Sequence, residues 1–150
     1  MPRTDNSTEI KAPLEKVWER LNDVENWPNL FTEYASAEIL ERNGDTIKFR
    51  LTTFPDPEYD GQVWSWVSER TVDPAAHTVK AHRIETGPFD HMNIEWYFEP
   101  VGDDATKMRW VQEFSMKPTA PATDDEAEVY INKNTKEQMA HIKEKLEAES

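Results

Sequence analysis

The sequence predicts an α+β fold: a curved antiparallel sheet of about seven strands around one long C-terminal helix, with two short helices after the first strand. Two observations support this prediction. Residues 62–70, 92–98 and 108–116 alternate in character with the two-residue period of extended strands. Residues 123–147 repeat their apolar side chains at helical spacing, after a capping box formed by Thr123 and Glu126. No internal repeat is present, and we expect one domain over residues 1–150.

The N-terminal segment predicts one strand and two short helices. Residues 7–11 mix polar and apolar side chains and are expected to form the first strand. Pro13 suits the first turn of a helix, because its missing N–H would be unpaired there in any case. Apolar side chains then follow at helical spacing: Leu14, Val17, Trp18 and Leu21. Asn22 and Asp23 end this helix, and residues 24–31 predict a second short helix or turn broken near Pro28.

The middle of the chain predicts the sheet. Strands are expected over 37–41, 46–53, 62–70 and 78–86, with a hairpin at Asn43-Gly44-Asp45 and a loop over 54–61. The last two strands each present a largely apolar face: Met92, Ile94, Trp96 and Phe98, then Met108, Trp110, Gln112, Phe114 and Met116. Such strands belong to a sheet with one buried and one solvated face.

The strand at 62–70 combines bulky aromatic residues with a cation. Its one face carries Gln62, Trp64, Trp66, Ser68 and Arg70. A guanidinium stays protonated at neutral pH, so it has to be paired or face water or a polar ligand. We interpret this face as one wall of a cavity that is apolar at one end and polar at the other.

The long C-terminal helix supports the same interpretation. Its inward stripe is apolar at both ends and polar in the middle: Ala127, Ile131, Asn134, Thr135, Gln138, Met139, Ile142 and Leu146. A helix that packs only on an apolar core rarely interrupts its stripe in this way. The sequence therefore predicts a cavity between sheet and helix.

Composition and charge exclude several function classes. The formal net charge is −13, which argues against nucleic-acid binding and against an anionic membrane surface. No apolar run approaches the roughly 20 residues that cross a bilayer, and no signal peptide is visible. The chain has no Cys, which fits a reducing cytoplasm, and its four His show no metal-ligand spacing. We expect a cytoplasmic protein without cofactor or metal.

Five stretches together resemble a known family: residues 3–7, 27–35 (WPNLFTEYA), 64–68 (WSWVS), 85–89 (ETGPF) and 108–118 (MRWVQEFSMKP). With the order of elements, they are similar to the bacterial type II polyketide aromatase/cyclases of the tetracenomycin and spore-pigment type. These belong to the START-like, or helix-grip, superfamily. The resemblance implies an enzyme that needs no cofactor. Its partners would be a minimal polyketide synthase and an acyl carrier protein bearing a linear poly-β-ketone, whose first ring closes between C9 and C14 by aldol chemistry and dehydration.

The resemblance also implies the site residues. Arg70 would be the central polar group, with Tyr34 and Ser68 as the other catalytic residues. The substrate-binding positions would be Trp27, Phe31, Trp66, Arg83, Phe89, Met92, Trp96, Trp110, Gln112, Asn132, Thr135 and Gln138. Two positions depart from the family pattern. Gln138 stands where close relatives have Asn, and Tyr130 replaces a His of the tetracenomycin enzyme.

The residues support this chemistry independently. A carbon between two ketones is already acidic, so the enzyme mainly has to fold the chain and stabilise an enolate, as a held guanidinium can. Tyr34 could donate a proton for dehydration. Ordinary structural roles compete: Arg70 could pair with neighbours of Glu69 or with Glu85, the tryptophans could fill a solid core, and Gln112 and Ser68 could satisfy each other.

Two other functions fit the same pattern. One is a non-catalytic START-like carrier of a hydrophobic or aromatic ligand, and the other is a protein-interaction module with a closed core. An acidic carrier protein would need a local basic patch on this acidic chain. We predict that some basic residues of the strands gather at the cavity mouth: candidates are Arg42, Lys48, Arg50, Lys80, Arg83, Lys107 and Arg109. The sequence leaves the oligomeric state open, with a slight preference for a monomer.

Overall fold

The computed structural model describes residues 2–55 and 63–149, and within them seven antiparallel strands form one sheet. The elements in chain order are β1 (Arg3–Ile10), α1 (Leu14–Asn22), the 3₁₀ helix η1 (Val24–Asn29), β2 (Tyr34–Asn43), β3 (Thr46–Thr53), β4 (Ser65–Asp73), β5 (Thr78–Arg83), β6 (Phe89–Val101), β7 (Ala105–Met116) and α2 (Asp124–Glu149). The strand order is β1-β7-β6-β5-β4-β3-β2. The predicted α+β helix-grip fold is confirmed.

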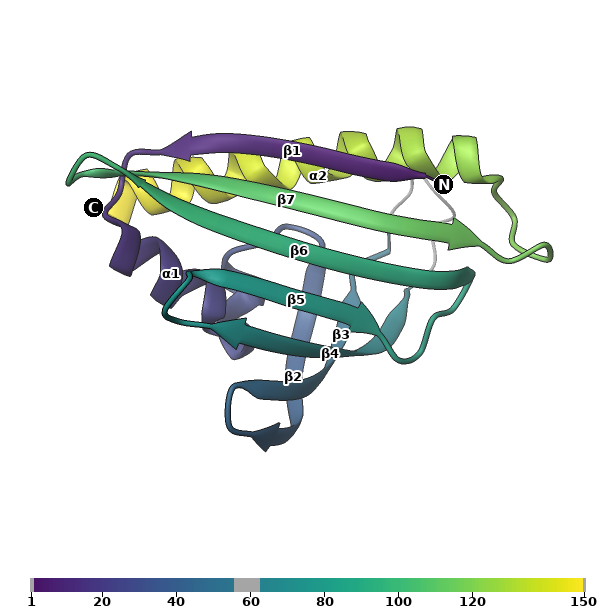
Figure 1. Cartoon of the computed structure of the whole chain (residues 1–150). Coiled ribbons are helices and arrows are strands. Elements are labelled where there is room, and N and C mark those ends of the chain that lie inside the picture. Colours follow the sequence, from purple (N-terminus) through teal and green to yellow (C-terminus); the bar gives the residue numbers. More distant parts are fainter. Residues whose placement is uncertain (1, 56–62, 150) are drawn as a thin grey trace.

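The long helix α2 runs alongside β1 and β7 at one edge of the sheet, while β2 to β4 form the opposite edge (Figure 1). Its C-terminal half is tied to the N-terminal part of the chain. Lys143 Nζ donates to the Glu9 carbonyl at 2.8 Å, and Glu147 accepts the Lys11 backbone N–H at 2.8 Å. Arg20 of α1 donates twice to the Glu149 carboxylate. These contacts hold that end of α2 in place.

The capping box predicted at the start of α2 is present. Glu126 N donates to the Thr123 hydroxyl, and the Glu126 carboxylate accepts from the Thr123 backbone N–H at 3.1 Å. These hydrogen bonds hold the pKa of Glu126 below its usual value, and they satisfy backbone groups that a helix start leaves unpaired. The N-terminus of α2 is therefore capped at the point where the connection from β7 enters the helix.

The two short helices follow from local sequence. Pro13 caps α1 with extended backbone, and the buried side chains Val17 and Leu21 lie one turn apart on its inner face. The 3₁₀ helix η1 contains Pro28, whose missing N–H disfavours a regular α-helix. It buries Trp27, so this short turn contributes a large aromatic side chain to the interior.

Buried side chains form two clusters. The larger one joins α1, η1 and the C-terminal half of α2 to the sheet, with Leu21, Phe31, Met108 and Ile142 almost fully buried. The smaller one lies under the N-terminal half of α2: Phe89, Met92, Phe114, Ala127 and Ile131. Burial of this apolar area supplies most of the drive to fold, at about 25 cal/mol per Å².

Several predicted boundaries shift. β1 begins at Arg3 rather than Ser7. The sequence did not indicate this earlier start, because the inward residues Thr4 and Asn6 are polar and give no hydrophobic alternation. β4 begins at Ser65, so Trp64 precedes the strand and Gln62 lies outside the described residues. β5 ends at Arg83 rather than residue 86.

Candidate active site

A cavity of about 500 Å³ lies between the inner face of the sheet and the N-terminal half of α2. Its lining takes side chains from both hydrophobic clusters. Lining residues Phe54, Pro121 and Glu126 are exposed and mark the open end, whereas Arg70 is 3% exposed. A volume of this size is typical of small-molecule sites. The closed-core module considered above predicts no such cavity and is therefore contradicted.

Twelve of the predicted site residues line this cavity. They are Tyr34, Ser68 and Arg70 from the catalytic set, with Trp27, Trp66, Arg83, Phe89, Met92, Trp96, Trp110, Gln112 and Thr135 from the substrate-binding set. β4 contributes Trp66, Ser68 and Arg70 from one face, as the alternation predicts. In the sheet register Ser68 lies opposite Arg83, and both project into the cavity from neighbouring strands.

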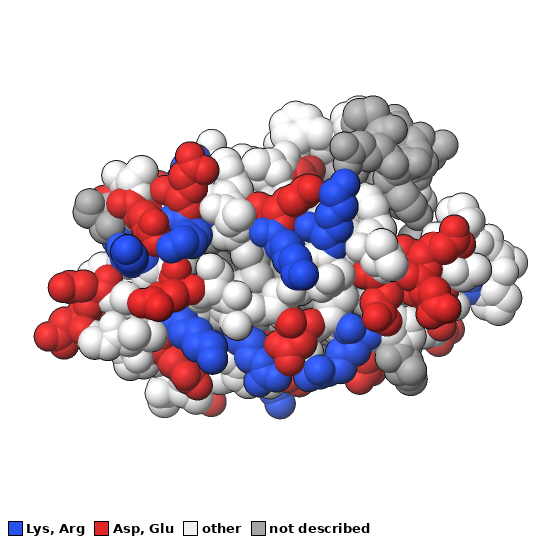
Figure 2. Space-filling view, turned by 90° about the horizontal axis from the view of Figure 1, so that it is seen from above, with Lys and Arg blue, Asp and Glu red and all other residues white. Residues whose placement is uncertain are grey.

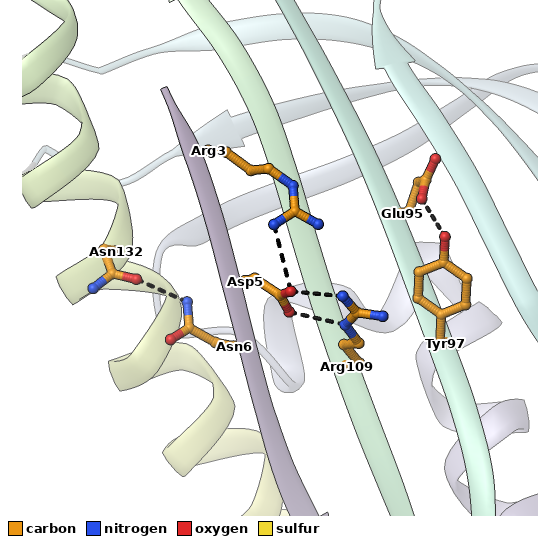
Figure 3. A network of polar contacts seen from close by, with 7 residues as sticks. All are labelled: Arg3, Asp5, Asn6, Glu95, Tyr97, Arg109 and Asn132. Atoms are coloured by element: carbon orange, nitrogen blue, oxygen red, sulfur yellow. Dashed lines mark hydrogen bonds and ion pairs between the residues drawn. The ribbon is translucent and has the colours of Figure 1, made fainter. Parts of the chain in front are cut away.

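Three predicted substrate-binding residues do not line the cavity. Phe31 is 2% exposed and packs in the core behind Trp27 and Tyr34. Asn132 faces β1, where its Oδ1 accepts a hydrogen bond of 2.9 Å from Asn6 (Figure 3). Gln138 bonds to Thr32 through both ends of its amide. Their positions support structural roles, because each is used up by contacts within the protein.

Arg70 is held at the buried end of the cavity by neutral groups. Its Nη2 donates to Asn22 Oδ1 at 2.6 Å and to the Leu21 carbonyl at 3.2 Å. The guanidinium carbon lies 5.4 Å from the Trp27 ring and 5.3 Å from the Trp96 ring. The alternative that Arg70 pairs with Glu85 is wrong, since Glu85 pairs with Arg50. Burial lowers the pKa of Arg70 to about 9, so the group is charged at pH 7.

A second polar group lies nearer the open end. The Arg83 guanidinium stacks between the rings of Trp66, at 4.0 Å, and Phe89, at 4.7 Å. Burial lowers its pKa to about 10, which again leaves it charged at pH 7. Burial and the charge of Glu33 raise the pKa of the Tyr34 phenol well above its usual value, so Tyr34 remains a proton donor at neutral pH.

Residues of the cavity lining carry several nitrogen hydrogen-bond donors. Three buried side-chain nitrogens of its lining have no acceptor among the described residues: Arg83 Nε, Trp96 Nε1 and Trp110 Nε1. Buried polar groups are normally paired, so unpaired nitrogens on residues of the lining favour a ligand that supplies acceptors. The arrangement therefore suits a planar ligand rich in oxygen acceptors.

Gln112 satisfies two hydroxyls rather than Ser68. Its Oε1 accepts from Thr135 Oγ1 at 2.7 Å and from Thr4 Oγ1 at 3.0 Å. All three side chains are buried. This triad ties β1, β7 and α2 together, so the polar middle of the helix stripe is explained partly by structure and partly by the cavity.

The Gln138 side chain has a structural role that can be tested. Its Oε1 accepts the Thr32 backbone N–H at 2.9 Å and its Nε2 donates to the Thr32 hydroxyl at 2.6 Å. This amide clamps α2 to the segment that leads into Tyr34. We expect Gln138→Met to lower the free energy of unfolding by about 1 kcal/mol, because the two hydrogen bonds between Gln138 and Thr32 are lost.

Urea unfolding would measure that loss. Lys136→Met, at an exposed position of the same helix, is the matched control and should change stability by less than about 0.5 kcal/mol. Equal stabilities of the two variants would contradict the clamp.

Among the lining residues that the predicted site does not include is Glu33, and the anchor of Arg70 was missed as well. Glu33 and Asn134 line the cavity, and the Asn134 amide donates to Glu33 at 2.9 Å. Asn22, which holds Arg70, lies at the end of a helix, where the sequence indicated only a stop. The available signal for Glu33 was its position next to Tyr34, a predicted cavity residue.

Two of the basic residues predicted at the cavity mouth lie elsewhere. Lys107 and Arg109 line a separate groove on the outer face of the sheet, where Arg109 donates twice to Asp5 (Figure 3). Lys48 pairs with Glu41, and Arg83 is the candidate that lines the cavity. The prediction is therefore wrong for Lys107 and Arg109. On the face in Figure 2, basic side chains are interspersed with acidic ones.

Two features bear on location and metal binding. No helix in the described ranges is long and apolar enough to cross a membrane. Among residues 2–55 and 63–149, no three His, Asp or Glu side chains are grouped so that they could hold a metal ion.

Comparison with known proteins gives the family. Residues 1–147 match the family described as polyketide cyclase/dehydrase and lipid transport. A candidate polyketide cyclase from Streptomyces cyaneus is 50% identical over 96% of this chain and 93% of its own length. Another from Streptomyces halstedii is 59% identical over 72% of this chain and 96% of its own length.

More distant relatives agree. The granaticin polyketide synthase bifunctional cyclase/dehydratase of Streptomyces violaceoruber is 25% identical over 93% of this chain, which spans 42% of that protein. The Zhui aromatase/cyclase of Streptomyces sp. R1128 shares the fold, with a TM-score of 0.82, 22% identity and coverage of 98% of this chain and 92% of that one. This chain belongs to the polyketide cyclase/dehydrase and lipid transport family.

Proposed function

We propose that this protein is an aromatase/cyclase that folds a linear poly-β-ketone, presented by an acyl carrier protein, and closes its first ring between C9 and C14. The single observation that carries the proposal is the donor-rich aromatic cavity with the charged Arg70 at its buried end. A poly-β-ketone in its keto form carries oxygen acceptors and no donors. The cavity offers the complementary set, and its flat aromatic walls suit a flat aromatic product.

The chemistry needs positioning and charge stabilisation more than a strong base. Loss of a proton from a carbon between two ketones gives an enolate, whose carbon attacks a ketone carbon of the same chain and forms the new C–C bond. The ketone oxygen becomes an alkoxide and takes up a proton. Arg70 is placed to stabilise the oxygen that gains negative charge, with donors that need no reorganisation.

Dehydration completes the ring. A second proton leaves carbon, the hydroxyl leaves as water after it gains a proton, and the remaining ketones enolise to the aromatic ring. Tyr34 is a suitable donor of that proton, because its raised pKa keeps the phenol protonated. Ser68 lies between Arg70 and Arg83 on the cavity wall and can hold a carbonyl oxygen through its hydroxyl.

Arg70→Met tests the proposal in a reconstituted minimal polyketide synthase. The variant removes the charge but keeps an apolar side chain of similar length, and we expect the fraction of C9–C14 product to fall at least tenfold, with other ring closures replacing it. Product analysis by chromatography and mass spectrometry measures the ratio. Arg109→Met, which removes a guanidinium from the outer face, should leave the product distribution as in the parent.

The family description also names lipid transport, which keeps the carrier function as a second candidate. A carrier requires the cavity but no group at a reacting centre. It predicts that Arg70→Met changes the affinity for aromatic ligands while the products of the synthase stay the same. That outcome would overturn the catalytic proposal.

A further inference from the structure

We infer that Asn22 is a positioning residue that holds Arg70 without neutralising it, so that the buried end of the cavity prefers the ionised form of a phenol or enol ligand over the neutral form. The inference rests on the proposed function in one respect, namely that the ligand oxygen meets Arg70. It adds a residue outside the predicted site and a charge state for the ligand.

The anchor lies at the C-terminal end of α1. Arg70 Nη2 donates to Asn22 Oδ1 at 2.6 Å and to the Leu21 carbonyl at 3.2 Å. The same carbonyl accepts the Trp27 indole N–H at 3.1 Å. Carbonyls in the last turn of a helix lack partners within the helix and form the negative end of its dipole. They attract a cation and leave its formal charge in place.

No carboxylate compensates this cation. In the described residues, Arg70 forms no ion pair with Asp or Glu, and its Nε and Nη1 make no hydrogen bond. The rings of Trp27 and Trp96 flank it, and the side chain is 3% exposed. In such surroundings a positive charge acts on a nearby oxygen more strongly than it would in water. An oxyanion gains from this contact, whereas a neutral hydroxyl gains far less.

The neighbouring carboxylate points elsewhere. Asp23 directly follows Asn22, but it is exposed, and its Oδ2 accepts a hydrogen bond of 2.6 Å from Asn26. Asparagine at 22 thus supplies an oxygen of the same shape as a carboxylate oxygen but without its charge. Substitution by aspartate would turn the anchor into an ion pair and remove the free charge from the cavity.

The test uses 7-hydroxycoumarin, a fluorescent phenol that ionises near neutral pH. We expect the pKa of the probe to fall by about one unit or more when it binds the parent protein, a tenfold gain in acidity. Asn22→Asp should abolish this shift. Asn29→Asp adds the same charge at an exposed position of η1 and should keep the shift. An unshifted probe on the parent, or equal shifts on the parent and Asn22→Asp, would overturn the inference.

A second measurement needs only the parent protein. Above the pKa of the free probe, 7-hydroxycoumarin should bind at least tenfold more tightly than 7-methoxycoumarin, which cannot ionise. Equal affinities would contradict the inference even if Asn22→Asp failed to fold. A shifted probe combined with unchanged products for Arg70→Met would sink the proposed function alone, and an unshifted probe combined with altered products would sink this inference alone.

Discussion

Phe31→Ala is expected to lower the free energy of unfolding by about 3–5 kcal/mol, because it empties a position in the middle of the aromatic core. The Phe31 ring lies 5.2 Å from the rings of Trp27 and Tyr34, and 6.1 Å from that of Trp110. Little of this space can collapse, since the neighbours are held by the sheet and by η1. Urea denaturation followed by tryptophan fluorescence would measure the loss.

Phe54→Ala is the matched control for this change. Phe54 lies at the open end of the cavity and is 55% exposed. The same substitution there should change the unfolding free energy by less than about 0.5 kcal/mol. If the two variants were equally stable, the position of Phe31 in the core would be wrong, and its expected role as a substrate contact would return.

Arg70→Met is expected to be more stable than the parent at pH 7, by roughly 1–4 kcal/mol, even though it should lose the proposed activity. The parent buries a cation whose partners are neutral, and that desolvation is costly. Methionine fills a similar volume without charge. The parent is therefore less stable at this position because it keeps the buried charge that the proposed mechanism needs.

The pH dependence of this stability difference tests whether the buried charge of Arg70 is its cause. The pKa of Arg70 is lowered to about 9 in the folded protein, so the folded state holds this proton less tightly than the unfolded state. The penalty is fully present below pH 9 and is relieved as pH rises above 9. We expect the stability difference between Arg70→Met and the parent to be constant from pH 6 to 8 and to shrink above pH 9. A variant less stable than the parent at pH 7 would contradict the argument.

The sheet and its inward faces could be predicted because burial leaves a period of two in the sequence. Trp66, Ser68 and Arg70 share a face of β4, and Met92 and Trp96 share a face of β6, as the alternation indicated. The start of β1 could not be predicted in this way. Its inward Thr4 and Asn6 are polar because they meet polar partners, Gln112 and Asn132, far along the chain.

The inward-facing polar residues of α2 show the same limit of prediction from the sequence. Thr135 and Gln138 stand on one inward face of α2, and both are buried. The periodicity could not say that Thr135 reaches the cavity while Gln138 is used to hold Thr32. That distinction depends on which loop packs over each turn of the helix, and helical spacing carries no information about it.

By itself, the sequence determined the class of fold, the inward faces of the strands and the placement of a guanidinium among tryptophans, because these follow from local periodicity and from the chemistry of single side chains. Only the tertiary structure decided that Arg70 would rest on Asn22 and the Leu21 carbonyl, that Arg83 would stack between Trp66 and Phe89, and that Phe31 would pack in the core instead of in the cavity. The physical reason is that these partners are chosen by packing across the whole sheet, and the Arg70 contacts in particular join segments almost 50 residues apart.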